Sequence, residues 1–257
     1  MAVLNIVTFN LRCNAECDGI NMFVNRRGNI LAKIDEVMPD VIGFQEMTAP
    51  MHDFLVRHLP DYAFVGRARS DNLRDEHVDI AYRRDRMELW GLDYFWLSPT
   101  PYIPGSRYPD QSDCPRITTA ALLRHRDFAV PFRVYNTHLD HVGPEARRLG
   151  MRQILDRITE DNAKQDFPFF ITGDLNAEPT ENTIADALAY GDYPVRDLTD
   201  TLGVTFHSWG TVESKIDYIF ADKRIVTPSN YKITRWTDEN NGMYLSDHYP
   251  VMCEIEF

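Results

Sequence analysis

The chain has 257 residues, 44% of them hydrophobic and 26% charged, which suits one soluble globular domain spanning 1–257. Its net charge of −12 argues against tight binding of duplex DNA, because such binding depends on Lys and Arg side chains at the phosphates. The sequence shows no apolar run near the about 20 residues that cross a bilayer and no signal peptide, so we expect a cytoplasmic protein without a membrane partner.

Short strands alternate with a few helices along the chain. The apolar spacing predicts helices over 27–38, 50–59, 144–158 and 182–190. Strands are predicted at 4–10, 41–46, 62–66, 78–82, 88–95, 118–124 and 130–137, then after the apolar run 167–170 and at 216–220, with a closing strand from Val251. Few strands are separated by the helix that a parallel crossover needs. We therefore expect mixed or antiparallel sheets packed face to face, with helices outside.

The segment 96–116 is rich in Pro, Gly, Ser and Asp and is predicted to be a long loop. Loops of this length in compact domains are usually functional or disordered. Two interpretations stay open: a surface excursion, or a loop that leans over the site and helps to choose the substrate.

Polar residues stand at the ends of several predicted strands. In Gly173-Asp174-Leu175-Asn176, the carboxylate and the carboxamide are two positions apart, so they share one face if the chain stays extended. The other strand-end residues of this kind are Asn10, Glu46, His138, Asp140, Asp217, Asp247 and His248. An unpaired polar group among apolar neighbours costs about 1–3 kcal/mol, so this repetition argues against an accident of packing.

These strand-end blocks resemble, in order, the motifs of the metal-dependent endonuclease/exonuclease/phosphatase superfamily, which includes deoxyribonuclease I and poly(A) deadenylases. The blocks are Thr8-Phe9-Asn10, Gln45-Glu46, Thr137-His138-Leu139-Asp140, Gly173-Asp174-Leu175-Asn176, Ile216-Asp217-Tyr218 and Ser246-Asp247-His248. The resemblance covers 5–257 and is nearest to the deadenylase-like and bacterial branch. It implies an α+β fold, a four-layer α/β/β/α sandwich of the deoxyribonuclease I type, with the site at one edge of the paired sheets.

Hydrolysis of a phosphate ester needs a cation, an activated water and a stabilised leaving oxygen. Oxygen ligands favour Mg²⁺ or Mn²⁺, and Glu46 is the first candidate ligand, with Asp247 and Asn10 beside it. Asp174 is expected to orient and deprotonate the attacking water. Asn176 is expected to donate a hydrogen bond to a phosphoryl oxygen, because a carboxamide donates without titrating.

His138 and His248 are the two imidazoles expected to face the phosphate. The resemblance implies that Glu76 pairs with His138 and Asp217 with His248, and such pairing raises the pKa of an imidazole. It also places Arg116 where relatives contact phosphate. Asp140 and His141 are expected behind the site, and no role is assigned to His52, His58, His77, His125 or His207.

The favoured function is therefore Mg²⁺- or Mn²⁺-dependent hydrolysis of a small phosphodiester or phosphomonoester. A single-stranded nucleic-acid exonuclease of the deadenylase type is the alternative substrate class. A catalytically silent module that binds a phosphorylated ligand is a third interpretation, but silent relatives lose the metal glutamate or a site histidine, and this chain keeps both. Protein partners are not indicated.

Overall fold

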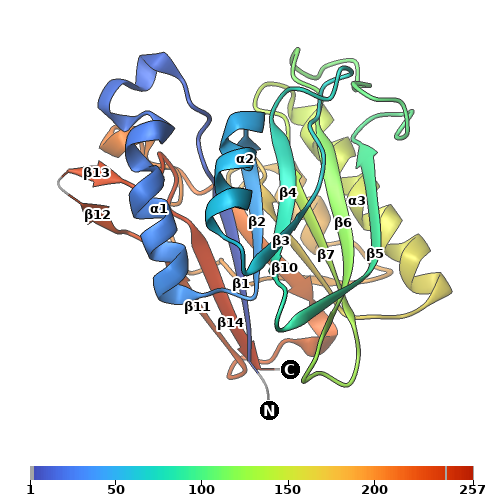
Figure 1. Ribbon diagram of the computed structural model, residues 1–257. Helices are drawn as coiled ribbons and strands as arrows, with labels where there is room; N and C mark the ends of the chain where they lie inside the picture. Colours follow the sequence, from blue (N-terminus) through green and yellow to red (C-terminus); the bar gives the residue numbers. More distant parts are fainter. Residues whose placement is uncertain (1–2, 241, 257) are drawn as a thin grey trace.

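The computed structural model describes residues 3–240 and 242–256, and two six-stranded sheets form its centre (Figure 1). The first sheet has the order β11-β14-β1-β2-β4-β3, with bounds Tyr231–Arg235, Val251–Glu256, Val3–Asn10, Val41–Met47, His77–Arg83 and Tyr62–Val65. The second has the order β5-β6-β7-β8-β10-β9, with bounds Met87–Trp96, Ile117–His125, Phe132–His138, Phe169–Asp174, Asp217–Asp222 and Val195–Asp197.

Both sheets are mixed. β1 runs parallel to β2 and β7 parallel to β8, whereas the other neighbours are antiparallel. The inner faces pack on each other through a shared apolar core, to which Leu4 and Ile6 of β1, Val134 of β7 and Phe170 of β8 contribute. The expected pair of packed mixed sheets is confirmed.

Four α-helices cover the outer faces (Figure 1): α1 (Phe23–Val37), α2 (Ala49–His58), α3 (Pro144–Lys164) and α4 (Asn182–Leu188). The apolar sides of α1 and α2 pack on β1 and β2, and those of α3 and α4 pack on β7, β8 and β10. The four-layer α/β/β/α sandwich is therefore confirmed. Among the described residues, none of these helices has the length and apolar character to cross a membrane.

Several element bounds differ from the prediction. α1 begins at Phe23, four residues early, because the buried Phe23 ring anchors its first turn in the core. α3 continues to Lys164, where the buried Asn162 side chain donates to the Phe167 carbonyl (3.1 Å) and ties the helix end to the next strand. The short strands β9 and β11 and the hairpin β12 (Glu239–Asn240) and β13 (Met243–Tyr244) were not predicted.

A buried carboxamide connects the two sheets directly behind the strand ends. Asn136 on β7 donates from Nδ2 to the carbonyls of Phe44 (2.9 Å) and Asp79 (2.8 Å) in the other sheet. Its Oδ1 accepts from Gln45 Nε2 (2.7 Å) and Thr172 Oγ1 (3.0 Å). All of its hydrogen-bonding capacity is used, so Asn136 fixes the spacing of the strands that carry the site.

Candidate active site

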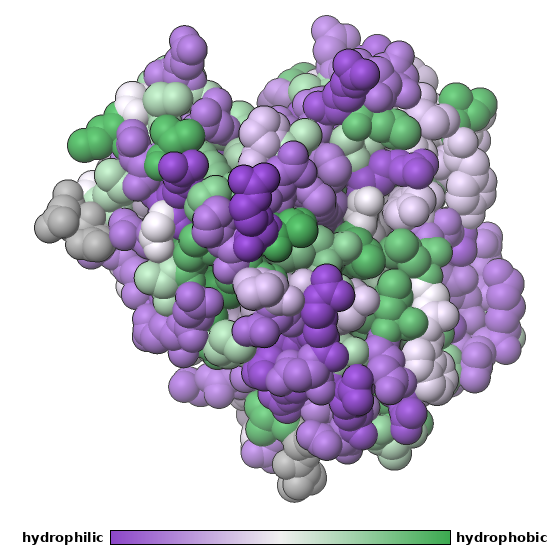
Figure 2. Space-filling view, in the orientation of Figure 1, coloured by the Kyte–Doolittle hydropathy of each residue, from purple (hydrophilic) through white to green (hydrophobic). Residues whose placement is uncertain are grey.

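A cleft of about 500 Å³ opens at the edge where β1, β2, β7 and β8 end. In Figure 2 the upper outline of the molecule is notched between the segment after β1 and the loops after β3 and β5. Eight of the ten predicted site residues line this cleft, namely Glu46, Glu76, Arg116, His138, Asp174, Asn176, Asp247 and His248. The other two, Asn10 and Asp217, hydrogen-bond to residues that line it.

Asp174 is the point at which groups from both sheets converge. Its Oδ2 accepts a hydrogen bond from Asn10 Nδ2 (2.9 Å) and lies 3.4 Å from His138 Nε2 and 3.8 Å from His248 Nε2. Burial, reinforced by the charge of Asp217, raises the pKa of Asp174 to about 7 although His248 opposes the shift. A carboxyl group with this pKa can accept a proton near neutral pH.

The extended conformation does not persist to Asn176, so Asp174 and Asn176 do not share one face of a strand as expected. β8 ends at Asp174, Asn176 has φ +47°, and its backbone N–H donates to Asp174 Oδ1 (2.9 Å). Asn176 Nδ2 donates to the Leu139 carbonyl (3.1 Å), which leaves its second N–H available. This tight turn, rather than strand pleating, brings the carboxamide into the cleft beside the carboxylate.

Glu46 stands at an irregularity near the end of β2, where the register with β4 shifts and its own φ is +57°. Oε1 accepts from Asn10 Nδ2 (3.1 Å) and Oε2 from the Cys13 backbone N–H (3.1 Å). Burial favours the neutral acid, but the His248 charge and these donors outweigh it and lower the pKa of Glu46. The carboxylate is therefore held ionised and aimed into the cleft.

The expected pair of Asp217 and His248 is present, with Asp217 Oδ2 2.8 Å from His248 Nδ1. Burial alone would lower the pKa of this imidazole. The charges of Asp217, Asp174 and Asp247 exceed that effect and raise the pKa of His248 to about 10. His248 is thus a buried cation at neutral pH, and its Nε2 faces the cleft side of Asp174.

The expected pair of Glu76 and His138 is not formed, and this detail of the prediction is wrong. Glu76 makes an ion pair with Arg69 Nη1 (3.0 Å), which takes up its charge. Burial, together with the nearby Arg116 and Arg69 guanidinium groups, lowers the pKa of His138 well below its usual value. His138 is therefore neutral, and its buried Nδ1 has no hydrogen-bond partner among the described residues.

Arg116 immediately precedes β6 and is 3% exposed. Its Nη2 lies 2.8 Å from His141 Nδ1 and its Nε 3.5 Å from Asp140 Oδ2. Asp140 does not line the cleft, as expected, but His141 lines it, so the expectation that His141 stands behind the site is wrong. Nη1 is buried and meets no acceptor in the part of the chain that the structure describes. A buried guanidinium N–H of this kind, at the wall of a cleft, is suited to an anionic oxygen of a ligand.

Sequence reasoning missed Arg12. Its guanidinium hydrogen-bonds to both carboxylate oxygens of Asp18 (2.9 and 3.1 Å) and lies 3.9 Å from Glu46 Oε2 and 3.8 Å from Asp247 Oδ2. Its backbone N–H donates to Asn10 Oδ1 (2.9 Å). The only signal in the sequence was its place two residues after Asn10.

The ligand atoms of Glu46, His138 and Asp174 lie within 4.8 Å of one another. Burial raises the pKa of Asp174 and of Asp247, so these carboxylates lack sufficient positive charge around them. Oxygen donors with such a deficit fit a hard divalent cation. Cys13 stands near Glu46 as well, but burial raises the pKa of its thiol to about 12, which makes it a poor ligand.

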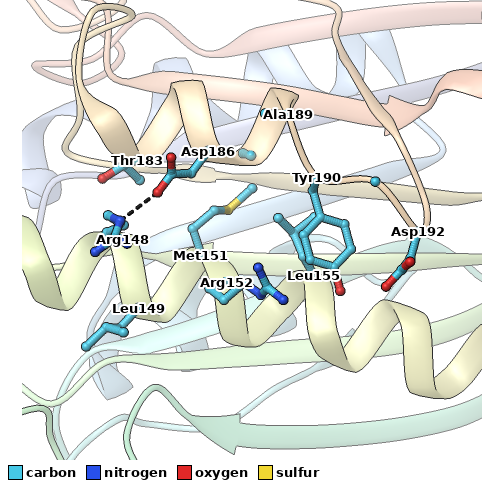
Figure 3. A pocket seen from close by; sticks show the side chains of 12 residues that line it. Arg148, Leu149, Met151, Arg152, Leu155, Thr183, Asp186, Ala189, Tyr190 and Asp192 are labelled. Atoms are coloured by element: carbon cyan, nitrogen blue, oxygen red, sulfur yellow. Dashed lines mark hydrogen bonds and ion pairs between the residues drawn. The ribbon is translucent and has the colours of Figure 1, made fainter.

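A second groove, of about 390 Å³, lies between α3 and α4 (Figure 3). Both arginines that line it are already paired with carboxylates: Arg148 with Asp186 (2.6 Å), and Arg152 with Asp156 (2.8 Å). None of the side chains drawn in Figure 3 presents a buried, unpartnered polar atom of the kind found at Arg116. This groove therefore offers no comparable chemistry.

The chain is similar to known proteins in sequence and in fold. The model of the Endonuclease/Exonuclease/phosphatase family matches residues 7–248. An endonuclease/exonuclease/phosphatase from Bacteroides vulgatus is 26% identical, with 100% of both chains covered and a TM-score of 0.89. The mannosyl-6-phosphatase of Bacteroides thetaiotaomicron is 25% identical over 99% of this chain and 100% of its own, with a TM-score of 0.84.

The catalytic domain of human Nocturnin, solved with bound sulfate, is 16% identical over 99% of this chain and 94% of its own, with a TM-score of 0.77, and shows likeness of fold alone. No curated protein sequence matches the chain.

Proposed function

Because the chain belongs to the endonuclease/exonuclease/phosphatase family, whose members hydrolyse phosphoric esters, we propose that its cleft hydrolyses a small phosphate ester with the help of Mg²⁺ or Mn²⁺. The observation that carries the proposal is the convergence on Asp174. One carboxylate oxygen there lies near donors from both sheets, Asn10 on one side and the two imidazoles of His138 and His248 on the other.

Three groups are suited to hold the phosphoryl oxygens. Arg116 offers the unpartnered Nη1, and His248 offers a protonated Nε2. Asn176 offers its second side-chain N–H. Charged donors in a buried site stabilise a developing anion without having to reorganise, and in many enzymes this stabilisation accounts for most of the rate enhancement.

The cation would be held by Glu46 and Asp247, with Asn10 Oδ1 beside them. A hydrogen bond to Asp18 holds the Arg12 guanidinium group at the outer side of these carboxylates. When bound, a divalent cation neutralises phosphoryl charge and stabilises the leaving oxygen. Asp174, with its pKa raised to about 7, accepts the proton of the attacking water. Asn10 Nδ2 donates to the carboxylates of both Asp174 and Glu46, which fixes their positions relative to each other.

A sugar phosphomonoester is the favoured substrate, since the mannosyl-6-phosphatase of Bacteroides thetaiotaomicron aligns over 99% of this chain. The unpartnered Nη1 of Arg116 at the wall of the cleft suits an oxygen of a dianionic terminal phosphate. A single-stranded nucleic acid is the second candidate, because Trp209 and Phe206 line the cleft and such aromatic rings can stack on bases.

The test is a substrate panel with the metal varied. Hexose 6-phosphates, p-nitrophenyl phosphate, bis-(p-nitrophenyl) phosphate and an oligoadenylate are assayed with Mg²⁺, Mn²⁺ or EDTA. Asp174→Asn is compared with Asp186→Asn, an exposed acid of the α3–α4 groove. We expect turnover of the monoesters that EDTA and Asp174→Asn abolish and Asp186→Asn preserves. Faster turnover of the oligoadenylate would favour the nucleic-acid alternative, and equal rates in Asp174→Asn and wild type would refute the site.

A further inference from the structure

Outside the cleft, a second cluster of ligating side chains joins α2 to the first sheet. His52 projects from α2, and His77 and Asp79 project from β4, one strand pleat apart on the same face. Their ligand atoms all lie within 4.8 Å of one another. Figure 1 shows that α2 lies over the side of the first sheet that carries β2 and β4.

The Asp79 carboxylate is at the centre of this cluster. It is 1% exposed, and its Oδ1 is buried without a hydrogen-bond partner in the described ranges 3–240 and 242–256. Oδ1 lies 3.4 Å from His77 Nδ1, which is buried in the same unpartnered state, and Oδ2 lies 3.5 Å from His52 Nε2. Direct hydrogen bonding between described residues therefore leaves one oxygen of this buried carboxylate, Oδ1, unsatisfied, which costs free energy.

The same distances suit a bound metal ion. Zn²⁺ binds imidazole nitrogen and carboxylate oxygen at about 2.0–2.2 Å, so neighbouring ligand atoms in a tetrahedron stand about 3.3 Å apart. The separation between Asp79 Oδ1 and His77 Nδ1, 3.4 Å, is close to this edge length, and so is the 3.5 Å between the other carboxylate oxygen, Oδ2, and His52 Nε2. The carboxylate can therefore reach a shared ion through either oxygen. The fold also leaves room for the carboxylate, because a Cβ at Gly66 would come within 2.0 Å of Asp79 Oδ1.

The orientation of His52 is that of a ligand. Its Nε2 faces Asp79, while its Nδ1 lies 3.5 Å from the carboxylate of Asp53. A carboxylate on the outer nitrogen is the usual support for a ligating histidine. The rings of His52 and His77 stack at 5.1 Å with 22° between their planes, so both present an edge to the same carboxylate. His52 is 28% exposed, which leaves a side open for a water ligand.

We propose that His52, His77 and Asp79 form a Zn²⁺-binding site, separate from the hydrolytic cleft, that fastens α2 to β4. Two imidazoles and one carboxylate favour Zn²⁺ over Mg²⁺, which prefers oxygen ligands alone. Met47, next to Glu46, pairs with His77 in the sheet, and α2 begins three residues after Glu46. Zn²⁺ at this site therefore holds the segment that carries the candidate catalytic glutamate.

The test measures Zn²⁺ affinity by competition with a chromogenic chelator, in excess Mg²⁺, for the full chain. We expect one tight Zn²⁺ in wild type and in Glu46→Gln, an affinity weaker by at least about 100-fold in His52→Ala and His77→Ala, and an unchanged affinity in His58→Ala, another histidine of α2. Zn²⁺ should also raise the melting temperature of wild type and not that of His52→Ala.

His52 is partly exposed at a helix surface, so His52→Ala decides the matter if His77→Ala does not fold. Tight Zn²⁺ binding that survives His52→Ala, or that disappears in Glu46→Gln, would overturn the proposal, as would the absence of tight binding in wild type. Because the readout is Zn²⁺ affinity, it is independent of whether the cleft hydrolyses phosphate esters.

Discussion

The inter-sheet carboxamide Asn136 gives a quantitative test of how the site is supported. Asn136→Ala removes the donors to the Phe44 and Asp79 carbonyls and the acceptor shared by Gln45 and Thr172. All four bonds are buried, and each is worth about 0.5–1.5 kcal/mol. Gln45 keeps its bonds to other partners, so part of the loss is recovered. We therefore expect the free energy of unfolding to fall by about 2–5 kcal/mol, a large share of the stability of a typical domain.

The assay is urea unfolding followed by tryptophan fluorescence, with Thr172→Val as the matched comparison. Thr172→Val deletes one of the four bonds while keeping the side-chain shape, and should cost about 1 kcal/mol. A loss below about 1 kcal/mol in Asn136→Ala, or equal losses in the two variants, would show that Asn136 does not couple the two sheets.

Three further predictions concern Asp140, Arg116 and Gly43. Burial opposes ionisation of Asp140, but N–H donors of Gly143, Ser112 and Val142 and the Ser112 hydroxyl outweigh it and lower its pKa to about 2. The ionised Asp140 therefore stabilises the folded state fully above the unfolded pKa of about 3.9, and this stabilisation is lost as pH falls through about 2. Asp140→Asn should lower the free energy of unfolding by roughly 1–2 kcal/mol at pH 7 in urea unfolding, and should flatten its pH dependence between about pH 4 and 2. An unchanged pH dependence would contradict this. Arg116→Lys should lower kcat/KM for a phosphomonoester by about 10- to 100-fold, because lysine lacks the guanidinium group whose Nη1 is unpartnered. Arg148→Lys in the α3–α4 groove should leave kcat/KM unchanged. Equal kcat/KM values for the two variants would show that Arg116 does not belong to the site. Gly43→Ala places a Cβ 2.5 Å from Asn136 Oδ1 and should lower the melting temperature. Gly28→Ala in α1 should not lower it, because a Cβ there would meet no described atom within 4 Å. An unchanged melting temperature in both variants would show that the sheets can separate.

The fold was predictable because its signals are local. Strands such as Val41–Met47 carry apolar runs that end in polar residues, and α2 shows helical spacing after Thr48. The strands β9 and β11 were missed because they are three and five residues long and owe their conformation to pairing with β10 and β14.

The site was predictable as a set of residues and less so as a set of contacts. The side-chain pair of Asp217 and His248 agrees with the resemblance. Glu76, in contrast, forms its ion pair with Arg69 rather than with His138, and no spacing in the sequence indicates this choice. Contacts of this kind depend on which cation lies nearer after folding. The turn at Asn176 was missed for another reason: a positive φ outside glycine has only a weak sequence signal.

Asn136 and Asp79 show the same limit in the core. Neither residue lies in a chemical motif. The role of Asn136 depends on partners 36 or more residues away, and that of Asp79 depends on a histidine from the helix α2. His52 and His77, which received no role from the sequence, gain one only when α2 is placed on β4.

We propose that Glu46 and His248 serve metal-dependent hydrolysis in the cleft. The most direct measurement is the rate of p-nitrophenyl phosphate and bis-(p-nitrophenyl) phosphate hydrolysis across a Mg²⁺ and Mn²⁺ titration. Wild type is compared with Glu46→Gln, His248→Gln and, as control, Glu145→Gln on the exposed side of α3. We expect EDTA to abolish turnover, Glu46→Gln and His248→Gln each to reduce kcat by about 10²–10⁴ with unchanged circular dichroism, and the control to match wild type. Metal-independent turnover, or full activity in Glu46→Gln, would contradict this proposal.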